Sequence, residues 1–335
     1  MRTARQLARC RRALATRRTA LGIAAALAVL GLQATASAQD FPNRAITIVV
    51  PFGPGTGNDI IARQVGQHMT AALGQSVIVD NRPGATGNIA SDYVAKSAPN
   101  GYTIYLPSTS ILLNQLVGSP NSNLIRDFEP VALSGALPYA LAVPSSLPAQ
   151  TVEQLVALAR SKPGQLNYAG YVGGVPQFLG EMLNRAGKVN IVMVPYKSTV
   201  EAATDFAAGH IQVLFTPVPS SLPFLQSKQG RVIAVTGTKR ATILPDVPTM
   251  AEAGYPDLTV EVAYFFLAPA GTPKAAVDKL SGAITAALHD AKVWAALAAQ
   301  GVEKKEGGPD ETRAYLADQL RKWEAIVKQS PAATR

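Results

Sequence analysis

Short apolar runs of strand length alternate along this chain with longer segments in which apolar residues recur at helical spacing. The run ITIVV at 46–50 predicts a strand, and the segment 59–73 predicts a helix that ends at Gly74. The apolar residues of this helix fall near one stripe and are Ile60, Ile61, Val65, Met69 and Leu73. The same pattern then predicts a strand at 76–80, a helix near 88–97 and a strand at 102–106.

The second half of the chain repeats this alternation. Thr151-Val152-Glu153-Gln154 is a capping box, which predicts a helix that Pro163-Gly164 ends. The further predicted elements are a strand at 166–169, a helix at 177–186, a strand at 189–194, a helix at 199–208, strands at 211–215 and 231–236, and a helical tail over 273–329. The pattern indicates an α/β fold with mixed, mostly parallel sheets and helices on both faces.

Two Gly/Pro-rich turns each lie between a predicted strand and a predicted helix. They read PFGPGTGN at 51–58 and NRPGATGN at 81–88. The first backbone N–H groups of a helix have no acceptor within it, and together they attract an anion. Both turns follow the carboxyl end of a strand, which is where open α/β sheets bind ligands. We therefore expect the two turns to face one anionic ligand.

The N-terminal residues have the composition of an export signal. Residues 1–18 contain seven Arg and no acid, residues 20–32 are an apolar run too short to span a membrane, and Ala36-Ser37-Ala38 is a cleavage motif. We predict a signal peptide over 1–38, cleaved after Ala38, and a periplasmic protein. The pair Arg17-Arg18 leaves twin-arginine export and an ordinary signal both open.

Charge and cysteine content exclude several classes of function. The formal net charge is +9, but removal of the predicted signal leaves 24 basic against 22 acidic residues, so a nucleic-acid partner loses its main electrostatic support. The only cysteine is Cys10, inside that signal, and the three histidines are scattered. We expect no disulfide, no thiol chemistry, no catalytic residue and no metal site.

The first turn also allows a dinucleotide-binding interpretation. Its glycines follow a strand, and Asp80 ends the next strand, near the place of a ribose-binding acid. Against this, Asn58 stands where the motif ends in Gly, and Pro54 removes one N–H group. An exported NAD-dependent oxidoreductase is therefore a distant alternative, and no cofactor is expected.

Several segments follow one another as they do in a known family. They are PFGPGTGNDIIAR (51–63), VDNRPGATGN (79–88), PNGYTIY (99–105), KPGQLNYA (162–169), LPDVPTMAEAGYP (244–256) and LAPAGTP (267–273). The chain resembles the substrate-binding proteins of tripartite tricarboxylate transporters, the Bug family, over essentially the whole mature sequence. The resemblance implies a two-lobed periplasmic binding protein of the Venus-flytrap, type II-like kind. Such a protein captures a small carboxylate, delivers it to membrane transporter subunits and catalyses nothing.

A ligand-sensing subunit for a membrane kinase would use the same closure and stays open as an alternative. We expect a monomer with lobe one at 39–139 plus 259–335 and lobe two at 140–258. The chain would cross between the lobes near 136–143 and 257–266, and two crossings suit a hinge.

The sequence departs from the family pattern at the turns. Thr56 and Thr86 each replace a glycine, which adds a hydroxyl group to each anion-facing loop. A histidine typical of a later turn is absent, Tyr171 and Val172 stand there, and Thr216 replaces a common acid. A second charged group of the ligand near these residues would lose its hydration without gaining enough hydrogen-bond or charged partners. An apolar group of the ligand would instead be stabilised by its burial. We expect a carboxylate with an apolar or aromatic body rather than a fully polar acid such as citrate.

The predicted ligand-binding residues come from the two Gly-rich turns, the end of the third strand and two turns of lobe two. They are Phe52, Gly53, Gly55, Thr56, Asn58, Ala85, Thr86, Gly87, Ser108, Thr109, Tyr171, Val172, Gly173 and Thr216. Asp59 is expected to support the first helix, because it would repel an anion. A valine at Gly87 is expected to harm binding more than folding, because it would fill the space of the carboxylate.

Overall fold

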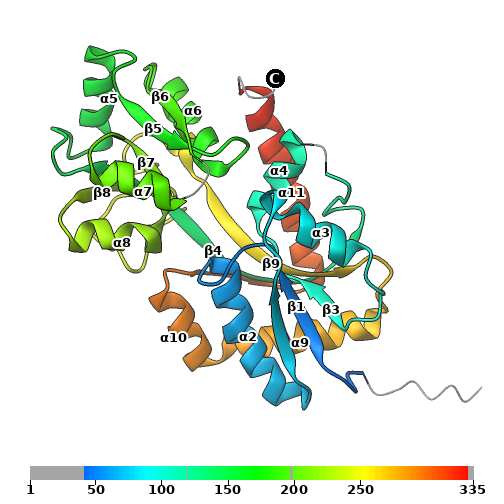
Figure 1. The fold of residues 1–335 in the computed structure, drawn as a ribbon. Coiled ribbons are helices and arrows are strands. Elements are labelled where there is room, and N and C mark those ends of the chain that lie inside the picture. The colour runs from blue at the N-terminus through cyan, green and yellow to red at the C-terminus, as the bar shows by residue number, and fades with distance from the viewer. Residues whose placement is uncertain (1–40, 119, 197–198, 331–335) are drawn as a thin grey trace, which may run out of the picture. The chain divides into compact units, whose positions relative to one another are not determined.

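A computed structural model describes residues 41–118, 120–196 and 199–330 (Figure 1). The chain divides into two compact units, residues 1–43 and residues 44–335, and the second contains all the helices and strands named here. The signal peptide predicted at 1–38 lies outside the described residues. Among the helices described, none combines the length and apolar character needed to cross a membrane.

Residues 46–117 form the first β/α units. Their elements are β1 (Ile46–Val50), α2 (Gly57–Leu73), β2 (Val77–Asn81), η1 (Ala85–Gly87), α3 (Asn88–Ala95), β3 (Thr103–Tyr105) and α4 (Thr109–Val117). β1 pairs in parallel with both β2 and β3, so the carboxyl ends of the three strands lie at one edge. There the N–H group of Arg82 donates to the carbonyl of Val50 at 2.8 Å, which keeps the two Gly-rich turns together.

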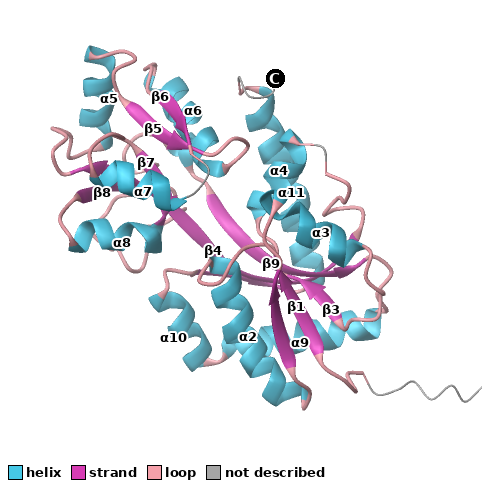
Figure 2. Ribbon diagram, in the orientation of Figure 1, coloured by secondary structure: helices cyan, strands magenta, loops and turns pink. Residues whose placement is uncertain are grey.

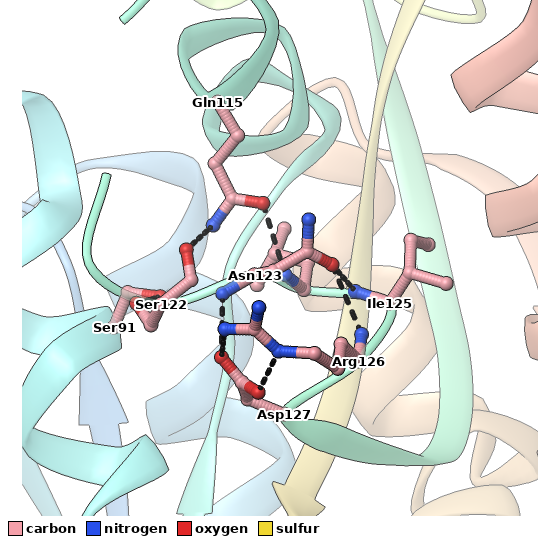
Figure 3. Close-up of polar contacts among 8 residues, drawn as sticks. Ser91, Gln115, Ser122, Asn123, Ile125, Arg126 and Asp127 are labelled. Atoms are coloured by element: carbon pink, nitrogen blue, oxygen red, sulfur yellow. Dashed lines mark hydrogen bonds and ion pairs between the residues drawn. The ribbon is translucent and has the colours of Figure 1, made fainter. Parts of the chain in front are cut away.

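The segment that follows α4 is held by its own polar side chains (Figure 3). Asn123 Oδ1 accepts hydrogen bonds from two backbone N–H groups at 2.9 and 3.0 Å, and Arg126 pairs with Asp127 at 2.6 Å. Gln115 of α4 joins this network, because its Oε1 accepts from the N–H of Leu124 at 2.9 Å. The network fixes the point at which the next strand begins.

Residues 152–258 contain a second set of alternating elements. They are α5 (Val152–Ser161), β5 (Asn167–Gly170), α6 (Val175–Gly187), β6 (Val192–Pro195), α7 (Thr199–Ala207), β7 (Leu214–Pro217), α8 (Val218–Gln226), β8 (Gly230–Val235) and η2 (Pro256–Leu258). β5 and β6 pair in parallel. The predicted cap of α5 is confirmed, since Thr151 Oγ1 accepts from the N–H of Gln154 at 3.2 Å.

The chain ends in α9 (Lys274–His289), α10 (Ala291–Ala299), β10 (Glu303–Gly307) and α11 (Pro309–Lys328). α9 and α10 pack with α2, whereas α11 packs with α4, so helices cover both faces of the sheet (Figure 1). The prediction of a wholly helical tail is wrong at β10, because residues 303–307 pair antiparallel with a strand distant in sequence.

That strand is β4 (Phe128–Pro144), which runs with β9 (Glu261–Pro269) between the two sets of elements (Figure 2). β4 pairs antiparallel with β9 from Phe128 to Pro138, and its residues from Tyr139 onward pair antiparallel with β7 and β8. The parallel pairs of β1 with β2 and β3 and these antiparallel pairs together make one mixed sheet, whereas β5 and β6 form a separate two-stranded sheet. One continuous strand therefore belongs to both sets.

The C-terminal segment contacts the second set of elements at two places. Trp323 of α11 packs edge-on against Phe178 of α6 with ring centroids 6.1 Å apart, and both side chains are buried. Glu303 of β10 accepts a hydrogen bond from the N–H of Thr242 at 2.7 Å and lies 3.7 Å from Lys239 Nζ.

Candidate functional site

A cavity of about 460 Å³ lies beside β4 and β9, where the two sets of elements face each other. Its walls come from the loops after β1, β2, β3, β5 and β7, together with Tyr139 of β4 and Tyr264 of β9. Loops that follow the carboxyl ends of strands form the ligand sites of open α/β sheets. The cavity is therefore the candidate binding site.

Four helices begin at this cavity, two from each set of elements. The lining residues at their starts are Gly57 and Asn58 of α2, Ser108 and Ser110 of α4, Gly174 and Val175 of α6, and Pro217 and Ser220 of α8. N–H groups in the first turn of a helix have no acceptor within it, and the helix dipole is positive at that end. Each helix dipole favours an anion by roughly 0.3–1 kcal/mol. Pro176 and Pro219 each remove one N–H group from the first turns of α6 and α8, so α2 and α4 offer more donors.

Charged side chains are missing from the described lining of the cavity, which includes no Asp, Glu, Lys, Arg or His. The negative charge of a ligand would thus be met by backbone dipoles and hydroxyl groups. These groups are fixed by the fold, so they lose little freedom when an anion binds.

Asp59 braces the loop after β1, as expected from the sequence. Its carboxylate accepts from the Gly55 N–H and from Asn81 Nδ2, both at 3.0 Å, and lies 2.8 Å from Arg63 Nη2. Burial raises the pKa of Asp59, but the hydrogen bonds from Arg63, Gly55 and Asn81 outweigh burial, and the pKa is lowered overall. Asp59 is not among the residues that line the cavity.

We expect Asp59→Ala to lower the free energy of unfolding by about 1–3 kcal/mol, because the Gly55 N–H loses its acceptor. Since the pKa of Asp59 is lowered on folding, its contribution is present above a pH of about 4 and is lost as the pH falls through the folded value. Urea unfolding at pH 7 and at decreasing pH measures both effects. Asp278→Ala is the matched control, because Asp278 also pairs four residues away, with Lys274, but its side chain is 53% exposed. Equal losses in the two variants would contradict the bracing role.

Two predicted ligand donors are engaged within the protein. The Thr56 hydroxyl donates to the carbonyl of Gly53 at 2.9 Å, and Asn58 Nδ2 donates to the carbonyl of Leu106 at 2.8 Å. Both residues line the cavity. Their donor groups shape the first loop and tie it to the end of β3, so the N–H groups of the loop are presented in a fixed arrangement.

The loop after β2 has an uncommon backbone. Gly84, Ala85, Thr86 and Gly87 all have positive φ, with values of 46° at Ala85 and 54° at Thr86. Residues other than glycine seldom adopt this conformation, and it costs of order 1–3 kcal/mol at each one. Asn114 of α4 secures the turn, because its Nδ2 donates to the Thr86 carbonyl at 2.9 Å. Such strain clusters at ligand-binding loops, and Thr86 lines the cavity.

Several hydroxyl groups at the cavity have no hydrogen-bond partner within the part of the chain that the structure describes. They belong to Thr86, Ser108, Ser110, Tyr139, Tyr171, Thr216, Ser220 and Tyr264. A hydroxyl that donates to a carboxylate forms a short, charge-assisted hydrogen bond. These groups therefore supply donors beyond those of the helix starts.

Three of these hydroxyls are phenols that influence one another. Burial raises the pKa of Tyr264, and Tyr139 adds to this effect; burial also raises the pKa of Tyr139, with a contribution from Tyr171. Burial, followed by the charge of Glu201, raises the pKa of Tyr171 to about 12. All three phenols are neutral donors at physiological pH and do not repel an anion.

Eight of the predicted ligand-binding residues line the cavity. They are Phe52, Gly55, Thr56, Asn58, Thr86, Ser108, Tyr171 and Thr216. Thr109 does not, because it is fully buried and its Oγ1 accepts from the N–H of Ala263 at 3.2 Å. Val172 does not line it either and is 78% exposed, so its predicted contact with the ligand stays a prediction.

Four further predicted residues lie in the same loops but do not line the cavity. They are Gly53, Ala85, Gly87 and Gly173. A Cβ atom at Gly87 would lie 2.2 Å from Ile111 Cδ1, so protein occupies the space that we expected for a carboxylate. The expectation that a valine there harms binding more than folding is therefore corrected. Gly173 has a close neighbour in Val117, whose Cγ2 would lie 2.9 Å from an added Cβ atom.

Sequence reasoning missed several lining residues. Tyr139 and Tyr264 lie on β4 and β9, and strand pairing decides which of their side chains face the cavity. The position of Tyr264 just before the LAPAGTP segment was a signal that could have pointed to it. Ser220 was missed because Pro217 and Pro219 make the start of α8 read as a loop.

The geometry gives the dinucleotide alternative no support. Asp80, its ribose-binding candidate, pairs with Arg82 at 2.7 Å and is not among the cavity residues. In the part of the chain described, no group of three or more His, Cys, Asp or Glu side chains is placed to hold a metal ion.

One protein family accounts for the strongest similarities of this chain. The family model described as the tripartite tricarboxylate transporter family receptor matches residues 61–331. BugT of Bordetella pertussis is 34% identical over 310 residues, which cover 91% of this chain and 95% of that protein.

Two solved structures that resemble the chain contain carboxylates. Rpa4515 of R. palustris with adipate is 31% identical, has a TM-score of 0.77, and the match covers 86% of this chain and 98% of that one. MatC of Rhodopseudomonas palustris with bound malate is 28% identical, has a TM-score of 0.72, and the match covers 85% of this chain and 99% of that one. The similarity thus spans both sets of elements.

Proposed function

The chain belongs to the tripartite tricarboxylate transporter receptor family, and from this premise we propose that it binds a small carboxylate in the cavity between its two lobes. It would then present that carboxylate to the membrane subunits of a transporter. As a member of this family it is a periplasmic receptor. Adipate and malate, which two similar proteins hold, belong to the same chemical class.

The observation that most supports this proposal is the convergence of four helix starts on a cavity lined without charged side chains, as far as the structure describes it. An anion gains from every helix dipole and from the unpartnered hydroxyls. A cation would meet no carboxylate there. A wholly apolar ligand would leave the hydroxyl donors without acceptors, which is costly in a closed cavity.

We propose that lobe one comprises 39–139 with 259–335 and that lobe two comprises 140–258. The change of partners along β4 supports this boundary, because β4 pairs with β9 up to Pro138 and with β7 from Tyr139. The crossings near 136–143 and 257–266 would form the hinge.

Export and assembly follow the same proposal. Residues 1–38 would direct export and be removed after Ala38, and the mature chain would act as a monomer. We propose no catalysis, since capture and release need only the movement of the two lobes.

A matched ligand panel tests the function. We expect mono-, di- or tricarboxylates to raise the thermal stability of the mature protein, and a ligand at a hundredfold its Kd adds about 2.7 kcal/mol. The controls are the amides of the same acids, such as adipamide for adipate, which keep the shape and remove the charge. Calorimetry then measures Kd for each acid that stabilises the protein. An amide that binds as tightly as its acid would contradict the proposal.

A further inference from the structure

A second cavity of about 480 Å³, open to solvent on one side, adjoins the ligand cavity on the surface of the proposed lobe two, between α7, β7 and α8. The two cavities share Tyr171, Thr216 and Ser220 in their linings. These three side chains therefore border both cavities, and the boundary that they form is called the passage below. Below, the second cavity is called the side cavity.

The walls of the side cavity beyond this passage are largely apolar. They consist of Ala203 and Ala207 of α7, Leu214 of β7 and Phe224 of α8, with the exposed Thr204 of α7 as the one polar residue among those described. Ala203 and Ala207 are four residues apart and thus lie on one face of α7. Because both are small, they leave open the space that larger side chains would fill.

The far wall belongs to a hydrophobic core cluster. Phe224 packs edge-on against the buried Phe206 with ring centroids 4.9 Å apart, within the core that contains Leu214. The described lining includes no Lys, Arg or His. A second carboxylate placed there would lose water without gaining a charged partner, whereas an apolar group would gain by burial.

We propose that the side cavity receives an apolar chain attached to the carboxylate, so that the preferred ligand is a monocarboxylic acid with four or more carbons beyond the carboxylate. This inference rests on the proposed function, because it places the carboxylate at the starts of α2 and α4. The chain then passes Tyr171, Thr216 and Ser220 into the side cavity. Each CH2 group buried in this way is expected to tighten binding about fourfold.

The test is a chain-length series measured by calorimetry on the mature protein. The probes are the straight-chain saturated monocarboxylates from acetate to octanoate. We expect Kd to fall about fourfold per CH2 group, and thus about 250-fold over the four CH2 groups that separate butanoate from octanoate.

Filling the side cavity should remove this gain. Ala207→Trp is expected to bind butanoate like the wild type and to lose the advantage of octanoate. Ala203→Leu fills the cavity less and serves if the tryptophan disturbs folding. Ala208→Trp is the control, because Ala208 is exposed and lines neither cavity.

The outcomes separate this inference from the function on which it rests. If butanoate binds measurably but Kd does not change with chain length, the inference is overturned and the proposed function still stands. The inference is also overturned if Ala207→Trp weakens the binding of butanoate and of octanoate by the same factor. If no carboxylate of any kind binds, the proposed function is overturned, and this inference with it.

Discussion

Ser110→Asp is expected to abolish carboxylate binding while leaving the protein as stable as the wild type. Ser110 is the second residue of α4, is partly buried, and lines the ligand cavity with an unpartnered hydroxyl. An acidic side chain in the first turn of a helix is stabilising by roughly 0.3–1 kcal/mol, because it interacts favourably with the helix dipole. The same carboxylate would occupy the N–H groups that the ligand needs and would repel its charge.

The size of this effect follows from Coulomb's law. Two unit charges about 5 Å apart at an effective dielectric constant of about 20 repel by about 3 kcal/mol, which corresponds to more than a 100-fold loss of affinity. Calorimetry with a verified carboxylate measures the loss, and urea unfolding measures the stability. Ser110→Asn is the control, because asparagine has nearly the shape of aspartate without its charge. This variant should bind the carboxylate within about tenfold of the wild-type affinity. Tight binding by Ser110→Asp would remove the start of α4 from the site.

Gly87→Val is expected to lower the free energy of unfolding by about 3 kcal/mol or more. The φ of Gly87 is +94°, which a β-branched residue adopts only under strain, and an added Cβ atom would lie 2.2 Å from Ile111 Cδ1 and 3.2 Å from Pro51 Cβ. Ile111 is fully buried, so it has little room to move. Backbone strain and overpacking therefore both lower the free energy of unfolding of this variant.

Urea unfolding of Gly87→Val against the wild type measures this loss. Gly53→Ala is the matched control from the other Gly-rich loop, because its φ is not positive and nothing lies within 4 Å of an added Cβ atom. We expect less than about 1 kcal/mol for the control. A folded Gly87→Val protein of wild-type stability would restore the original expectation that the glycine leaves room for the ligand.

The β/α units were predictable because their signals are local. Gly74 ends α2 with a left-handed φ of 65°, and Thr151 caps α5 through its hydroxyl, as the sequence indicated. β4 was missed, because Pro130, Gly135 and Pro138 interrupt its apolar run and mark loops in most sequences. Its continuity comes from partners more than a hundred residues away, such as β9, and no local pattern encodes that pairing.

The candidate site was predictable mainly on one side of the cavity, although Tyr171 and Thr216 on the other side were predicted as well. The Gly-rich turns predict the start of α2 and the strained loop before α3, because a Gly-rich segment after a strand is typical of a turn that leads into a helix. The start of α8 was hidden, because Pro219 and Pro223 argue against a helix although Pro is well tolerated in a first turn. Tyr139 and Tyr264 depend on the register of β4 and β9, which the sequence alone leaves undetermined.

The continuity of β4 has a mechanical consequence for the proposed receptor. A hinge made of loose chain turns freely, but this one is a hydrogen-bonded strand shared by both lobes, so closure has to twist it. The register of β4 shifts near Gly135 and again between Leu141 and Ala142, and such irregularities are where a strand bends most easily. We therefore expect the strand to resist twisting, which would limit the angle between the proposed lobes and favour one resting position when the ligand leaves.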